Sequence, residues 1–172
     1  MSKAQALILG QIKHANETLA ELKDRHIIFE FNGTRQEFIL TAYESYENIS
    51  ALLCNPTESI NKLDKEILEL LPTNVSLILV IGDARKFVDI EAATALGITV
   101  SDTNSTLLGA STQEEIEKKS IEILDETLFT GIPTNPINDP EVVAENTAKR
   151  VTELIGSLGA FEEFDVADAL AG

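Results

Sequence analysis

Short apolar runs alternate with stretches of helical periodicity over the first hundred residues, and this alternation limits the fold more than any other feature. We predict a strand at each apolar run, namely residues 6–9, 26–31, 49–54, 75–82 and 98–100. We predict a helix in each intervening stretch, namely residues 13–24, the segment that follows Thr34, residues 59–71 and residues 89–96. Strands that alternate with helices form a parallel sheet covered on both faces, with right-handed crossovers. The sequence therefore predicts an α/β fold, a three-layer, flavodoxin-like, doubly wound parallel sheet with strand order 2-1-3-4-5.

The remainder of the chain predicts two additional C-terminal helices. Thr112 and Glu115 have the spacing of a capping box at the start of a helix over residues 112–128, as Thr34 and Glu37 do earlier in the chain. Pro140 occupies the favoured first position of a second helix, over residues 140–158. We expect one flavodoxin-like domain over residues 1–158, with its core at 5–105, followed by an acidic tail at 159–172.

Each C-terminal helix carries a distinctive face. An apolar stripe on the second helix predicts that it packs on the sheet domain, through Val143, Val151, Leu154 and Leu158. The first helix carries a run of acids, Glu114, Glu115, Glu117, Glu122, Asp125 and Glu126. This run predicts a solvated helix face, and a docking face for a basic partner is the alternative.

The charge balance excludes several classes of partner. Thirteen basic and 29 acidic residues leave a net charge of −16, which disfavours nucleic acid and membrane surfaces. The single cysteine, Cys54, rules out an internal disulfide and a cysteine-based metal cage, and His14 and His26 lack metal-ligand spacing. We therefore expect no bound metal. No apolar run is long enough to cross a membrane or to serve as an N-terminal secretory signal, so we expect a cytoplasmic protein.

One stretch carries a family resemblance. Leu71-Pro72 precedes the run VSLILVIG, which leads through the turn Gly82-Asp83-Ala84 into VDIEAATALG and GITVSDT. This order resembles the substrate domain of the D-isomer-specific 2-hydroxyacid dehydrogenases, in which the last motif has the form GIxVxNT. The resemblance covers about residues 5–105, and a weaker similarity at 131–161 resembles the helix that links the two domains of these enzymes.

The departures from the family pattern bear directly on activity. In the family, a second domain with a Gly-x-Gly-x-x-Gly turn binds the dinucleotide, and the catalytic arginine, glutamate and histidine lie in that domain or its hinge. This sequence has no such turn, so we predict no catalytic residues, no cofactor and no binding of NAD(H). The resemblance implies a non-catalytic, stand-alone α/β domain that serves as a small-ligand or interaction module. The alternative is one half of a NAD-dependent 2-hydroxyacid or glyoxylate reductase that works with a separate cofactor-binding domain.

The candidate ligand site lies where strands end, because open α/β sheets bind ligands at that edge. Asn55 follows the third predicted strand, and Gly82, Asp83, Ala84 and Arg85 follow the fourth. The competing interpretation is that these residues only form turns. In the family, a Gly-x-Gly turn receives the substrate carboxylate at this point, whereas Ala84 replaces the second glycine here and Asp83 repels an anion. We therefore predict a small-molecule ligand other than a free carboxylate. Because the equivalent linking helix contributes to dimer contacts in the family, we also expect a homodimer through residues 140–158.

Overall fold

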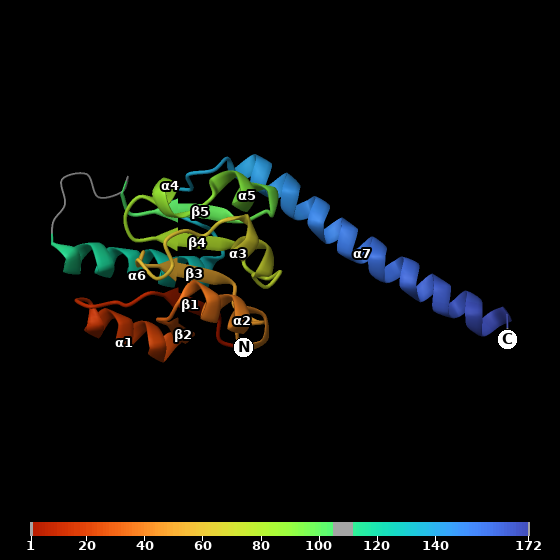
Figure 1. The fold of residues 1–172 in the computed structure, drawn as a ribbon, viewed down its shortest axis with the longest axis horizontal. Coiled ribbons are helices and arrows are strands. Elements are labelled where there is room, and N and C mark those ends of the chain that lie inside the picture. Colours follow the sequence, from red (N-terminus) through yellow and green to blue (C-terminus); the bar gives the residue numbers. More distant parts are fainter. Residues whose placement is uncertain (1, 105–111, 172) are drawn as a thin grey trace.

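The computed structural model describes residues 2–104 and 112–171 and contains the predicted sheet (Figure 1). Its five strands are all parallel and lie in the order β2-β1-β3-β4-β5, which confirms the predicted topology. The strands are β1 Gln5–Leu9, β2 Ile27–Phe31, β3 Ala51–Cys54, β4 Leu77–Val80 and β5 Thr99–Asp102. The central strands β3 and β4 are buried at every residue, as expected for strands covered on both faces.

Helices cover both faces of the sheet. They are α1 Asn16–Arg25, α2 Arg35–Ser45, α3 Lys65–Leu70, α4 Ala84–Phe87, α5 Ile90–Ala95, α6 Gln113–Thr130 and α7 Pro140–Ala171. One apolar core forms between the sheet and α2, α3 and α5, and a second forms between the opposite face and α1 and α6. Both predicted capping boxes are present, Thr34 with Glu37 on α2 and Thr112 with Glu115 on α6. No helix in the described part of the chain is long and apolar enough to cross a membrane.

Charged contacts hold α6 against α1. The carboxylate of Asp125 accepts hydrogen bonds from Arg25 at 2.7 Å and from the ring of His26 at 2.8 Å. Burial raises the pKa of Asp125, but the hydrogen bonds and charge interactions with Arg25 and His26 outweigh that effect and hold the pKa below its ordinary value. The ionised carboxylate is therefore part of the α1–α6 packing.

The connection from α6 to α7 seals one edge of the sheet. The amide of Ile137 donates to the carbonyl of Val100 at 2.7 Å, and the amide of Val100 donates to the side chain of Asn138 at 2.9 Å. Asn138 is buried and its amide group donates in turn to the carbonyl of Ile98 at 2.8 Å. The backbone groups at the outer edge of β5 are thus satisfied by this connection rather than by another strand.

The α7 helix departs from its prediction in length and in packing. The predicted boundary at residue 158 is wrong, because the helix continues to Ala171 through the segment expected to form a tail. The predicted burial of its apolar stripe is also wrong for three of the four residues. Val143 is buried, whereas Val151 and Leu154 are each 48% exposed and Leu158 is 65% exposed. The helix axis diverges from the domain (Figure 1), and the first turns of α7 are the part that contacts α5.

The first turns of α7 dock mainly through polar contacts. Asn146 donates to the carbonyl of Thr94 at 2.9 Å, and Thr147 donates to the carbonyl of Gly97 at 3.1 Å. Arg150 donates to the carbonyl of Leu96 at 3.2 Å. These carbonyls lie at the end of α5 and in the turn that follows it, where helices leave acceptors unpaired. The docked part of α7 therefore supplies hydrogen-bond donors to the carbonyls at the C-terminal end of α5.

Candidate functional site at the carboxyl edge of the sheet

The turn that follows β4 is stabilised by its own side chains. Gly82 has a φ of 113°, a conformation that favours glycine, and Asp83 caps α4 by accepting a hydrogen bond from the amide of Arg85 at 3.1 Å. The amide of Gly82 donates to the hydroxyl of Thr103 at 3.2 Å. These two donors of the turn are therefore engaged within the chain.

Asp102 is the acceptor for the first amide of α4, that of Ala84. It ends β5, is 2% exposed, and accepts a hydrogen bond from the amide of Ala84 at 2.9 Å. Its position corresponds to the asparagine of the GIxVxNT pattern, so a carboxylate here replaces a neutral amide. Asp102 is not among the predicted site residues, although its departure from the motif was a signal for it. The amides of Gly82, Ala84 and Arg85 all have internal acceptors, and two of these acceptors are carboxylates.

A cavity of about 340 Å³ lies near the ends of β1 and β3. It is lined by Gln11, Lys13, His14, Asn32, Asn55, Pro56, Thr57, Gln113 and Glu117. Asn55, half-buried, donates through its side chain to the carbonyl of Gln11 at 2.8 Å. In this strand order β1 and β3 are the switch point at which ligands bind in open α/β folds. The lining includes Asn55 but none of residues 82–85, so this cavity brings together only part of the predicted site.

The carboxylate of Glu117 accepts hydrogen bonds from the backbone amides that precede α1. Glu117 is fully buried, and its carboxylate accepts backbone hydrogen bonds from Lys13 at 3.2 Å, His14 at 2.7 Å and Ala15 at 3.1 Å. The prediction that the acids of α6 form a solvated face is wrong for this residue. Its spacing places it on the same helix face as the buried Ile121 and Leu124, and that periodicity was the signal for burial.

The remaining titratable candidates do not form a reactive group. Burial raises the pKa of the Cys54 thiol, so the nucleophilic thiolate is disfavoured. Among the residues that the structure describes, no group of three or more histidine, cysteine, aspartate or glutamate side chains could hold a metal ion. The carboxyl edge consequently offers hydrogen-bonding groups and internal carboxylates, and its cysteine is not activated.

Comparison with known proteins agrees with the fold and the motif. No family model matches the chain. A 2-hydroxyacid dehydrogenase of Schizosaccharomyces pombe is 34% identical over 103 residues, which are 58% of this chain and 30% of that protein. The 4-methyl-2-oxopentanoate reductase A of Aspergillus oryzae is 31% identical over 102 residues, which are 57% of this chain and 31% of the reductase.

Solved structures give the same relationship. The glyoxylate reductase from Paecilomyes thermophila superposes with a TM-score of 0.55 at 28% identity, over 59% of this chain and 32% of that chain. The D-mandelate dehydrogenase of Rhodotorula graminis shares the fold with a TM-score of 0.54 at 17% identity, over 60% of this chain and 32% of that chain. The chain thus spans about a third of the length of the relatives that it matches. The matched part of this chain is a partial, substrate-domain-like relative of the D-2-hydroxyacid dehydrogenases.

Proposed function

We propose that this chain is a non-catalytic module in which the turn that receives a substrate carboxylate in the related enzymes is closed to 2-oxo acids. The observation that carries the proposal is the hydrogen bond from the Ala84 amide to the Asp102 carboxylate. Asp83 holds the amide of Arg85 in the same way. An incoming carboxylate would have to displace a bonded carboxylate and would be repelled by both acids at short range.

A titration with hydroxypyruvate, followed by amide NMR, tests this function. We expect no saturable shift at residues 82–85 of the unmodified chain. In a variant that combines Asp83→Gly, Ala84→Gly and Asp102→Asn, both carboxylates that repel an anion are removed and a neutral, weaker acceptor faces the residue-84 amide, so binding becomes detectable. Circular dichroism verifies that the variant is folded. Saturable binding of hydroxypyruvate by the unmodified chain, mapped to the Ala84 amide, would refute the proposal.

The second candidate function is one half of a 2-hydroxyacid or glyoxylate reductase. It is favoured by the relatives, which are described as dehydrogenases and reductases. This candidate requires hydroxypyruvate or a related 2-oxo acid to bind at the turn in the unmodified chain, so the same titration separates the two functions. NADH fluorescence tests a separate prediction, that the chain itself binds no NAD(H); a saturable change would favour the reductase.

The interaction partner that we propose is a second copy of the chain, bound through α7. Four apolar side chains of this helix are 48–65% exposed at helical spacing, namely Val151, Leu154, Ile155 and Leu158. An antiparallel pair of helices related by a two-fold axis between residues 154 and 155 places Val151 opposite Leu158 and Leu154 opposite Ile155. The stripe is therefore complementary to itself, as an isologous interface requires.

Sedimentation equilibrium tests this pairing. We expect the unmodified chain to associate and the variant Leu154→Ser/Ile155→Ser to be monomeric. The matched control is Ser157→Ala, an exposed position on the same helix. A monomeric unmodified chain, or an unchanged association in the double variant, would exclude this interface.

A further inference from the structure

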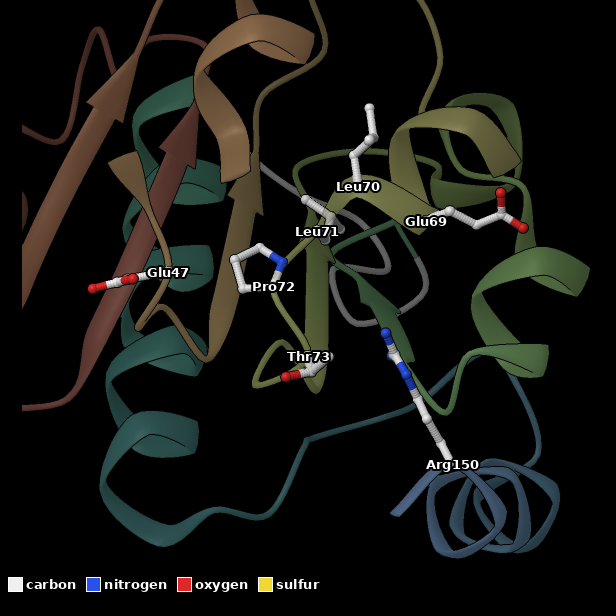
Figure 2. Close-up of a pocket in the computed structure, with 7 residues that line it drawn as sticks. All are labelled: Glu47, Glu69, Leu70, Leu71, Pro72, Thr73 and Arg150. Carbon is white, nitrogen blue, oxygen red and sulfur yellow. The ribbon is translucent and has the colours of Figure 1, made fainter. Parts of the chain in front are cut away.

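A second cavity lies at the opposite edge of the sheet from the turn and the β1/β3 cavity. Its volume is about 370 Å³, within the usual range for small-molecule sites, and Figure 2 shows the residues that line it. The lining residues lie at the end of α3, in the connections that lead into β3 and β4, and on α7, and they are Glu47, Glu69, Leu70, Leu71, Pro72, Thr73 and Arg150. None of the residues predicted as site residues lines this cavity.

Arg150 supplies a positive charge that the described side chains do not pair. Its guanidinium, with five N–H donors, gives one hydrogen bond to the carbonyl of Leu96 at 3.2 Å. Among the ion pairs within 4.0 Å in the described part of the chain, none includes Arg150. In Figure 2 the half-buried side chain extends from α7 toward the segment of Leu71, Pro72 and Thr73. The remaining donors can therefore meet a ligand without breaking an existing ion pair.

The walls of the cavity define the rest of the ligand. Leu71 and Pro72 are buried and form an apolar surface beside Arg150. The exposed carboxylates of Glu47 and Glu69 extend outward, away from Arg150, in Figure 2, so they do not neutralise it. Their charge at the rim nevertheless disfavours an anion of high charge such as phosphate. A planar monoanion matches the fork of one arginine, and an apolar body matches the leucine and proline surface.

We propose that this cavity binds a small aliphatic monocarboxylate, with its carboxylate on Arg150 and its hydrocarbon chain on Leu71 and Pro72. Because Arg150 belongs to α7 and the apolar wall belongs to the connection before β4, the ligand bridges the helix to the domain. The site is independent of the closed turn after β4, and its absence would leave the proposed function untouched.

An NMR titration of the full chain with isocaproate tests the site. We expect saturable shifts at Leu71, Thr73 and Arg150, with a Kd on the order of 1 mM. The neutral amide of the same acid lacks the carboxylate, and inorganic phosphate lacks the hydrocarbon chain. Each should therefore bind at least about tenfold more weakly. Arg150→Gln should weaken isocaproate binding by about tenfold or more, whereas Lys149→Gln, the same charge change on an exposed neighbour, should have no effect. The amide shifts of Asn146 and Thr147 verify that α7 stays docked in the variant.

A second measurement needs no variant. Across acetate, butyrate and isocaproate, affinity should rise by about fourfold for each added methylene that is buried. Equal affinity across the series, equal binding of the acid and its amide, an unchanged affinity in Arg150→Gln with α7 docked, or shifts confined to residues 82–85 would each overturn the proposal.

Discussion

Replacing Gly97 with alanine tests how α7 is attached to the domain. Gly97 has a φ of 75° and lies against the first turns of α7. A methyl group at this position would lie 2.9 Å from the amide nitrogen and 3.0 Å from the Cα of Thr147. Because these are backbone atoms, the helix as a whole must shift, and the hydrogen bond from Thr147 to the Gly97 carbonyl is then lost.

The expected loss of stability has two parts. An alanine in the left-handed region costs about 1–2 kcal/mol. The overlap with the α7 backbone adds about 1–3 kcal/mol, the usual cost of inserting a methyl group into a packed contact. Together they predict a decrease of about 3 kcal/mol in the free energy of unfolding, which lowers Tm by roughly 6–12 °C for a chain of this size.

Urea-induced unfolding measures the difference directly, with Gly131→Ala as the matched control. Gly131 has nearly the same φ, 74°, and no atom within 4 Å of an added methyl group. The control therefore carries the backbone strain and the change in unfolded-state entropy, but not the contact with α7. If the two variants lose equal stability, the reasoning that Gly97 is the contact point of α7 is refuted.

Three further predictions follow from the packing. Glu117→Ala should lower the free energy of unfolding by about 3 kcal/mol, because three backbone donors lose their acceptor. Glu114→Ala, at an exposed position on the same helix, should change it by less than about 0.5 kcal/mol, and similar losses in urea-induced unfolding would contradict the role of Glu117. At concentrations where the chain is monomeric, Leu154→Ala should lower the free energy of unfolding by less than about 1 kcal/mol, whereas Leu124→Ala, at a fully buried position, should lower it by about 2–5 kcal/mol. Equal losses would mean that Leu154 is packed in the core. The folded-state pKa of Asp125 is lowered, so its ionised form stabilises the fold above about pH 4, and this stabilisation is lost as the pH falls further. Asp125→Asn should therefore cost less than about 1 kcal/mol at pH 7 and reduce the loss of Tm at acid pH, and an unchanged dependence of Tm on pH would contradict this.

Local patterns in the sequence determined the architecture. The alternation of apolar runs and helical stretches predicted five parallel strands, and the crossover rule limited their order to few alternatives. The capping boxes at Thr34 and Thr112 were also readable, because each depends on a spacing of three residues. The same local information located the turn after β4, since a glycine ends the most apolar strand.

Tertiary structure decided what occupies each donor and what covers each apolar face. Asp102 meets the Ala84 amide across 18 residues and Glu117 meets the loop before α1 across more than 100, and no local spacing encodes such pairs. The stripe on α7 illustrates the same limit. Its periodicity predicts that Leu154 and Leu158 lie on one apolar face, but the helix axis diverges from the domain after the contacts of Asn146, Thr147 and Arg150, and both leucines are exposed. Periodicity identifies a face to be covered, whereas the path of the chain through space determines whether the domain covers it.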